Sequence, residues 1–390
     1  MTNEREKKIL VVDDVPQNVR LLEMNLKSEG YTVISAYSGQ EALEKVAAEK
    51  PDLILLDIMM PIMDGNEVCR RIRRDHNGRW IPIVMITAYE SGTEKKVQSL
   101  DDGADDFIKK PVERIELLAR VRSLLRVKEL QDELIRINNQ LEEELSLAKD
   151  VQQALLPQEF PDIPGLEFSH RYIPSLIVGG DFFDIQEIAP SVLAVFVCDV
   201  MGHGPQAAMI TGIVKALLAQ LMHYYPNPDD LLSQMNNRFN DIMASSNLPI
   251  FITAFCVVIN TLNGTGVYAN AGHPVPFLIK TRNSDVEELS SEHGPAIGMM
   301  PDASYQSNSL KLDNGDIMFL FTDGLLELMN VDRVQFGITE LHRAIQNNMN
   351  LSPEAFIEAI ISAADAFSGG LYTEDDVTLL ALKYNNVGAD

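Results

Sequence analysis

The chain has 390 residues, enough for two or three domains with separate hydrophobic cores. Its 57 acidic and 32 basic residues give a formal charge of −25, which disfavours a nucleic-acid partner. It has neither a basic N-terminal segment followed by an apolar run nor an apolar stretch approaching the ~18 residues that span a bilayer, so we expect a cytoplasmic protein with no membrane partner.

The first part of the chain, from Lys8 to about Lys128, alternates short apolar runs with amphipathic stretches. Three of the runs cover residues 9–12, 53–56 and 81–86. This alternation predicts a parallel sheet with helices on both faces, and the runs are apolar throughout because both faces are buried. Functional residues of such folds collect at the carboxyl ends of the strands.

Polar residues stand at those predicted strand ends. They are Asp13, Asp14, Asp57, Thr87 and Lys110. The constellation resembles a response-regulator receiver domain with a flavodoxin-like (βα)5 fold. A carboxylate becomes a phosphoryl acceptor when a divalent ion neutralises both it and the incoming oxygens, and a lysine adds a compact positive charge.

The resemblance assigns roles to these positions. It implies that Asp57 accepts the phosphoryl group, that Asp13, Asp14 and Asp57 hold Mg²⁺, and that Lys110 pairs with the phosphate. Thr87 would be the hydroxyl switch and Phe107 the aromatic gate. The alternative is a receiver-like interaction module that is not phosphorylated.

Between Arg114 and Pro157 the chain has neither proline nor glycine, which predicts one long helix. Apolar residues recur at spacings of three and four, close to a 3.5-residue repeat, with a stutter near Leu141. They are Leu130, Leu134, Ile137, Leu141, Leu145, Ala148, Val151 and Leu155. We expect a coiled-coil linker that forms a parallel homodimer; the alternative is that the stripe folds back onto its own chain.

From about Gln158 the pattern changes to strands and hairpins mixed with helices. Strands are predicted at residues 192–197, 250–259 and 266–269, and helices at residues 207–221, 229–243 and 352–367. Asn263-Gly264 is a strong hairpin signal between two of the strands. Antiparallel strands with helical pairs suggest two face-to-face sheets with helices outside.

Aspartates in this part stand where predicted strands meet turns. Asp181 follows Gly179-Gly180, Asp199 precedes a glycine-rich loop, and Asp323 precedes Gly324. A further pair is Asp375-Asp376. Asp181 and Asp199 are 18 residues apart, about two strands and a hairpin turn. Carboxylates that converge at a sheet rim need a cation to relieve their repulsion.

An ordered set of landmarks carries a second resemblance. They are AKDVQQALLP (148–157), VGGDFFD (178–184), CDVMGHG (198–204), NAGHP (270–274), Gly315-Asp316, FTDGLLE (321–327) and DDVT (375–378). Residues 148–384 thereby resemble the metal-dependent PPM-type serine/threonine phosphatases. The similar branch comprises the bacterial sporulation and stress-response phosphatases, whose substrates are anti-sigma-factor antagonists. The implied fold is a four-layer αββα sandwich.

The resemblance implies a binuclear metal site. Asp181, Asp199, Asp323 and Asp375 would coordinate two Mn²⁺ or Mg²⁺ ions with the Val200 carbonyl, and these ions would activate water. Whether Asp375 or Asp376 is the ligand stays open.

Other residues near these motifs have weaker assignments. His203 is a candidate general acid or a loop-ordering residue, and His273 is more consistent with a structural role. Arg171 is a weak candidate for binding phosphate. Asp184 is either a support for the metal ligands or structural. The cysteines, Cys69, Cys198 and Cys256, should be buried thiols.

We therefore expect a multidomain α/β plus α+β protein. Its predicted parts are a receiver (1–122), a coiled-coil linker (123–157) and a phosphatase domain (158–390). A histidine kinase or phosphotransfer protein would phosphorylate the receiver and so control dephosphorylation of an anti-sigma-factor antagonist. The alternative is a non-catalytic adaptor with a phosphatase fold that binds a partner under receiver control.

Overall fold

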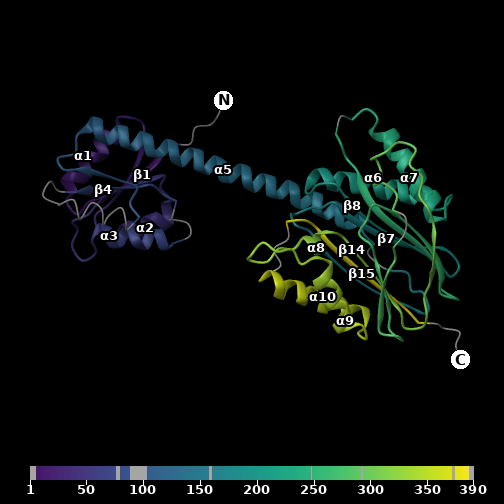
Figure 1. Ribbon diagram of the computed structural model, residues 1–390. Helices are drawn as coiled ribbons and strands as arrows, with labels where there is room; N and C mark the ends of the chain where they lie inside the picture. The colour runs from purple at the N-terminus through teal and green to yellow at the C-terminus, as the bar shows by residue number, and fades with distance from the viewer. Residues whose placement is uncertain are drawn as a thin grey trace. The chain divides into compact units, whose positions relative to one another are not determined.

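The computed structural model (Figure 1) describes residues 6–75, 80–87, 103–157, 160–246, 248–290, 293–370 and 374–385. Contacts divide the chain into two compact units, Met1–Leu141 and Glu142–Asp390. The division falls inside helix α5 (Arg114–Leu155). The domain limits expected from the sequence stay a prediction. None of the helices in the described ranges is long and apolar enough to cross a membrane.

The first unit contains the predicted parallel sheet, in the order β2-β1-β3-β4-β5. Its strands are β1 (Lys8–Val12), β2 (Thr32–Ala36), β3 (Leu53–Asp57), β4 (Ile83–Thr87) and β5 (Asp106–Lys109). The helices described beside α5 are α1 (Pro16–Lys27), α2 (Gly39–Glu49) and α3 (Gly65–Arg74). The flavodoxin-like arrangement expected from the alternating pattern is confirmed.

Both faces of this sheet are buried, because successive side chains of a strand point to opposite sides. Leu10 and Val12 pack in a core shared with α2 and α3. Ile9 and Val11 pack in a second core shared with α1 and the beginning of α5. The apolar runs of the sequence therefore correspond to strands without a solvent face.

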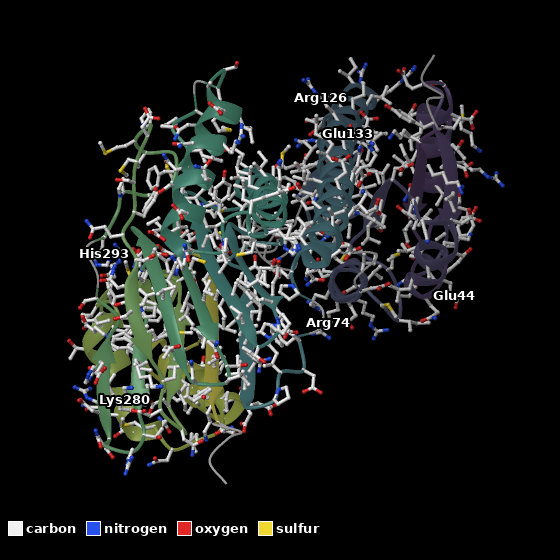
Figure 2. The ribbon with its side chains drawn as sticks, turned by 90° about the vertical axis from the view of Figure 1, so that its right-hand side faces the viewer. Glu44, Arg74, Arg126, Glu133, Lys280 and His293 are labelled. Carbon is white, nitrogen blue, oxygen red and sulfur yellow. The ribbon has the colours of Figure 1, made fainter. Side chains whose placement is uncertain are left out.

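Helix α5 is continuous over 42 residues. Leu117, Leu118, Val121 and Leu125 pack in the core of the first unit, whereas the apolar stripe that follows is exposed. Leu134 is 60% exposed. Charged side chains such as Arg126 and Glu133 extend from the same helix (Figure 2). The helix prediction is confirmed, and the stripe has a solvated surface in the single chain.

The second unit has two antiparallel sheets of five strands. The first, β13-β10-β9-β8-β7, comprises β7 (Asp181–Ala189), β8 (Val192–Val200), β9 (Ile252–Asn260), β10 (Thr265–Ala271) and β13 (Asn308–Lys311). The second, β12-β11-β14-β15-β6, comprises β6 (Leu166–Ile173), β11 (Phe277–Lys280), β12 (Asp285–Glu288), β14 (Ile317–Phe321) and β15 (Val377–Tyr384). The predicted hairpin at Asn263-Gly264 joins β9 and β10.

Five helices accompany these sheets in the described part of the second unit. They are α6 (Pro205–Leu221), α7 (Pro228–Met243), α8 (Gly324–Glu327), α9 (Gly337–Asn348) and α10 (Pro353–Ser368). The helices predicted at residues 207–221, 229–243 and 352–367 correspond to α6, α7 and α10, with ends shifted by one or two residues.

Three cores define the layers of this unit. Phe182 and Phe196 face α6 and α7, whereas Phe183 and Val195 face the second sheet and meet Leu320 and Leu380. On the outer face of the second sheet, Phe319 packs with α9 and α10. The order is therefore helix, sheet, sheet, helix, as the αββα expectation requires.

Candidate functional site

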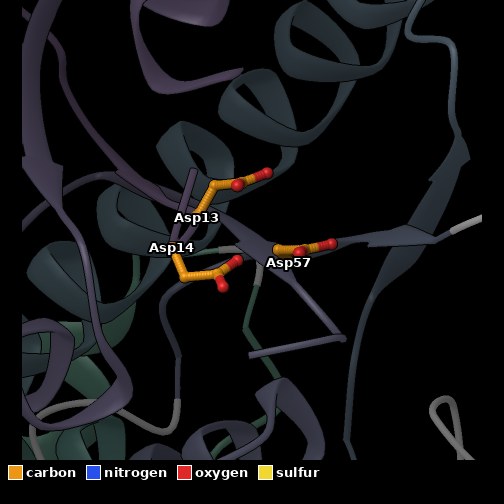
Figure 3. Close-up of side chains that lie close together, drawn as sticks. All are labelled: Asp13, Asp14 and Asp57. Atoms are coloured by element: carbon orange, nitrogen blue, oxygen red, sulfur yellow. The ribbon is translucent and has the colours of Figure 1, made fainter. Parts of the chain in front are cut away.

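The receiver residues meet at the carboxyl end of the parallel sheet. Asp13 follows β1, and Asp57 and Thr87 are the last residues of β3 and β4. Carboxylate oxygens of Asp13, Asp14 and Asp57 all lie within 4.8 Å of one another, as Figure 3 shows for the three side chains. Oxygen ligands in this arrangement suit Mg²⁺.

Lys110 lies against the same carboxylates. Its Nζ is 2.8 Å from Asp13 Oδ2 and 3.0 Å from Asp57 Oδ1. Burial raises the pKa of Asp57, and the ammonium of Lys110 opposes that rise. Burial alone would lower the pKa of Lys110, but its hydrogen bonds to Asp13 and Asp57 raise it. The lysine therefore stays charged beside the acceptor.

The two other receiver residues lie on neighbouring strands. Thr87 is buried next to the strand that ends in Asp57, since Asp57 pairs with Ile86 in the sheet register. Phe107 of β5 is half-buried and packs against the core that contains Met85. The structure thus gathers all six receiver candidates around one end of the sheet.

In the second unit, a hairpin brings the first two candidate metal ligands together. Asp181 is the first residue of β7 and pairs directly with Asp199 of β8, as the 18-residue spacing predicts. Their carboxyl groups interact electrostatically, since burial and, second to it, the Asp199 charge raise the pKa of Asp181. Next to Asp199, the Val200 N–H donates to Gly180 O at 3.3 Å.

Two threonines of the opposite sheet hold Asp181. Thr322 Oγ1 and Thr378 Oγ1 each donate to Asp181 Oδ2 at 2.7 Å, and the Thr378 N–H donates to Thr322 Oγ1 at 2.9 Å. The second oxygen, Asp181 Oδ1, is buried without a hydrogen-bond partner. Its environment therefore leaves one carboxylate oxygen available for a cation.

Asp323 and Asp375 flank these threonines in sequence and bring further negative charge. The pKa of Asp199 is raised to about 8. The largest cause is burial, and the negative charges of Asp323 and Asp375 are the next largest. Burial, followed by the Asp199 charge, raises the pKa of Asp181 well above its usual value. Burial also raises the pKa of Asp323 and Asp375. Shifts in this direction mark a site that lacks positive charge.

Asp376 has a different environment from Asp375. Its Oδ1 accepts from the Ser175 N–H at 2.8 Å, and its Oδ2 accepts from the Gly180 N–H at 2.5 Å. Both oxygens therefore hold the loop that precedes Asp181. Asp375 is partly exposed, and its Oδ1 accepts the Asp376 N–H. This geometry favours Asp375 as the metal ligand.

The histidines differ in exposure. His203 is exposed, and its charge opposes the burial-driven rise in the pKa of Asp375, so the two side chains interact electrostatically. His273 is buried, its Nδ1 is 3.0 Å from Thr253 Oγ1, and burial lowers its pKa to about 3. Asn270 Nδ2 donates to the His273 carbonyl oxygen, and the His273 N–H donates to Asn270 Oδ1. These contacts favour the structural interpretation of His273 and leave both interpretations of His203 open.

Arg171 and Asp184 form ion pairs with helices. Arg171 of β6 pairs with Glu358 of α10, and both side chains are about half exposed. Asp184 Oδ2 lies 2.8 Å from Lys215 Nζ, which ties β7 to α6. These partners favour structural roles. The three cysteines are free and buried, as expected.

Four residues beside the candidate ligands had no role in the sequence analysis. Thr322 and Thr378 hold Asp181, Gln152 bonds Gly179, and the Tyr172 hydroxyl is buried near Gly179 without a partner. All except Tyr172 lie in motifs that the sequence analysis noted. Their partners are distant in sequence, so spacing gave no sign of these contacts.

The donor set of the second unit fits divalent cations. It consists of hard oxygen atoms, including a buried unpaired carboxylate oxygen, and its aspartates repel one another. Within the described ranges, the receiver aspartates are the group of at least three whose ligand atoms all lie within 4.8 Å. The aspartates of the second unit are more widely spread than that.

Comparisons with known proteins agree with this division. Residues 9–122 match the family described as response regulator receiver domain. The response regulator PleD of Caulobacter vibrioides is 51% identical over 127 residues, which are 33% of this chain and 28% of PleD. The chain therefore spans little more than a quarter of the length of that relative.

Two solved structures share the fold of the second unit. The SiaA-PP2C domain of Pseudomonas aeruginosa superposes with a TM-score of 0.57 at 20% identity, covering 64% of this chain and 99% of that domain. The RsbU and RsbW domains of Rv1364c from Mycobacterium tuberculosis give a TM-score of 0.50 at 22% identity. The match covers 60% of this chain and 63% of that one. At these identities the likeness concerns the fold.

The fold and the family matches thus give a receiver domain followed by a domain with the PP2C fold. A second family match, described as Stage II sporulation protein E (SpoIIE), covers residues 190–385, half of the chain. The chain belongs to the SpoIIE family.

Proposed function

We propose that the chain is a metal-dependent protein serine/threonine phosphatase whose rate is set by phosphorylation of Asp57. One observation carries the catalytic part. Asp181 has one oxygen fixed by two threonine hydroxyls and the other buried and unpaired, beside the Asp199 carboxyl group. Such a group requires a cation when it is ionised.

Asp181, Asp199, Asp323 and Asp375, with the Val200 carbonyl, would hold two Mn²⁺ or Mg²⁺ ions. When bound, such ions supply the Lewis acidity that activates water and neutralises phosphoryl oxygens. Thr322 and Thr378 orient Asp181. The exposed loop Met201-Gly202-His203 borders the site, and His203 would donate a proton to the leaving serine or threonine oxygen.

The substrate class follows from the family branch and from the site. The loop of residues 201–203 is exposed, which leaves the site open to a phosphate that is carried on another protein. We assign phosphoserine or phosphothreonine on an anti-sigma-factor antagonist as the substrate. Support comes from the SpoIIE match and from the ordered motifs of residues 148–378.

Control would begin at the receiver. A histidine kinase or phosphotransfer protein would phosphorylate Asp57, assisted by Mg²⁺ on Asp13 and Asp14 and by Lys110. Helix α5 contributes to the receiver core near its start and carries Gln152 near its end, so it is the element available to transmit the change. We propose that its exposed stripe pairs with the same stripe of a second copy.

The test is Mn²⁺-dependent release of phosphate from p-nitrophenyl phosphate and from a phosphorylated antagonist. We expect Asp199→Asn to abolish both, whereas Asp241→Asn, which removes an exposed charge from α7, should retain them. If the wild-type chain is inactive with Mn²⁺ yet still binds the antagonist, the phosphatase assignment is wrong and the protein is an adaptor.

A further inference from the structure

Gln152 is buried on a part of α5 whose neighbouring side chains are exposed. It is 6% exposed, whereas the adjacent Val151 is 59% exposed. A buried amide needs hydrogen-bond partners for both its oxygen and its nitrogen. The position of this polar residue on the helix therefore calls for an explanation.

Both ends of the Gln152 amide bond the same residue. Gln152 Nε2 donates to Gly179 O at 2.6 Å, and the Gly179 N–H donates to Gln152 Oε1 at 3.1 Å. The side chain thus pairs with the backbone of Gly179 as a neighbouring strand would. A residue of the helix thereby holds both backbone polar groups of Gly179, 27 positions further along the chain, and so fixes the two peptide units that flank it.

Gly179 leads directly into the candidate metal site. A Cβ on Gly179 would overlap Asp376 Oδ2 and the Tyr172 hydroxyl, and a Cβ on Gly180 would lie 2.7 Å from the Val200 carbonyl oxygen. The Gly180 N–H donates to Asp376 Oδ2, and Asp181 follows. A shift of Gly179 therefore cannot be absorbed by free space around it.

The helix itself is not tightly packed at this level. Within the second unit, an apolar groove of about 500 Å³ separates it from α6, lined by residues such as Leu147, Val151, Ala208 and Met209. Beside this groove, the Gln152 amide is a specific polar link between this turn of α5 and the loop before Asp181.

We infer that Gln152 is a positioning residue for the metal site: by fixing the backbone N–H and carbonyl of Gly179 it places Asp181 and keeps Gly180 against the Val200 carbonyl. This inference rests on the proposed phosphatase function and extends it. Residues that orient metal ligands typically contribute about 10- to 100-fold to metal affinity or activity.

The test uses the full-length chain carrying Asp13→Asn, which weakens the receiver metal site, so that calorimetry reports Mn²⁺ binding by the second unit. Gln152→Met keeps the side-chain volume but removes both hydrogen bonds, and Gln152→Ala removes the side chain. Lys149→Ala, at an exposed position of the same helix, is the control. Phosphate release at graded Mn²⁺ concentrations and thermal unfolding without Mn²⁺ are measured in parallel.

We expect Gln152→Met to weaken calorimetric Mn²⁺ binding about tenfold and to raise the half-saturating Mn²⁺ concentration equally, with partial recovery of the rate at high Mn²⁺. Lys149→Ala should match wild type. Unchanged Mn²⁺ affinity in both Gln152 variants would overturn the inference, even if their unfolding temperatures fall. Inactivity of the wild-type chain would instead count against the proposed function, and the calorimetric comparison would still decide the role of Gln152.

Discussion

Protonation of the aspartates at the rim of the two sheets is controlled by burial and by their mutual repulsion. Asp181 and Asp199 are both displaced toward the neutral form, and the hydroxyls of Thr322 and Thr378 only partly oppose this for Asp181. A bound cation lowers the pKa of such carboxyl groups, because it favours their ionised form.

The stability of the metal-free chain should therefore depend on pH. The folded-state pKa of Asp199, about 8, exceeds the ordinary value of about 3.9, so the folded state binds more protons than the unfolded state between these values. The stability contributed by protonated Asp199 is present at low pH and is lost as pH rises toward 8. The stabilisation by Mn²⁺ should grow over the same range.

Thermal unfolding in EDTA at pH 5.5 and 8, with and without added Mn²⁺, checks this. Asp199→Asn should lose less stability than wild type between the two pH values and should gain less from Mn²⁺. Equal pH dependence in wild type and variant would show that Asp199 keeps an ordinary pKa.

The threonine hydroxyls on Asp181 give a second prediction. Thr378→Val keeps the shape of the side chain but removes the 2.7 Å hydrogen bond to Asp181 Oδ2. We expect the half-saturating Mn²⁺ concentration to rise about tenfold, and Thr378→Ser to stay near wild type. A Mn²⁺ titration of phosphate release measures both, and a valine variant that behaves like the serine variant would refute the assigned role of the hydroxyl.

Sequence reasoning found the charged members of the site better than the groups that hold them. Asp181, Asp199 and Asp323 stand beside glycines at turns, so the residues themselves indicate a ligand. Thr378 is 197 positions from Asp181, and nothing in its own neighbourhood indicates that contact. Whether a threonine reaches Asp181 depends on which strand ends lie at the same edge of the two sheets, and the local sequence does not determine this.

Strands and helices with clear apolar patterns were easier to predict from the sequence than short or polar ones. The β7–β8 hairpin was predicted because the 18-residue spacing of Asp181 and Asp199 fits two strands and a turn, and because most of β8 is an apolar run. β12 (Asp285–Glu288) reads DVEE and pairs with β11 at the edge of its sheet, so its polar residues carry no strand signal. α9 was also missed, since many of its residues are polar.

The exposed stripe of α5 provides a prediction about assembly. Leu134→Asp places a charge on the stripe, whereas Asn139→Asp places the same charge about 140° further around the helix. If the stripe pairs two copies, the first variant should become monomeric in sedimentation velocity while the second stays dimeric. Identical behaviour of the two variants, or a monomeric wild type, would exclude pairing through this stripe.

At the scale of the whole molecule, the receiver and the phosphatase domain should be coupled. Beryllofluoride on Asp57 mimics phosphorylation, and we expect it to raise the rate of phosphate release by a factor within the ~5- to 150-fold range typical of allosteric coupling. Asp57→Asn should abolish the response and retain the basal rate. If beryllofluoride leaves the rate of the wild-type chain unchanged, the receiver does not control phosphate release.

The fold class of both units was predictable, whereas the order of strands in the second unit was not. The alternation of runs in residues 8–128 and the change to hairpins after Gln158 determine the two classes. By contrast, β6 lies beside β15, and Ser175 bonds Asp376 across 201 positions. Pairings this distant form only when the sheets assemble in three dimensions, and the local periodicity of the sequence does not indicate them.

Because β15 fills a position between β6 and β14, the second sheet stays incomplete until translation has passed residue 384. That strand carries Thr378 and is preceded by Asp375. A ribosome-bound chain that stops short of β15 therefore has two separated strand edges and lacks Thr378, which bonds Asp181. The newly synthesised protein should be catalytically silent until this segment has been made and inserted.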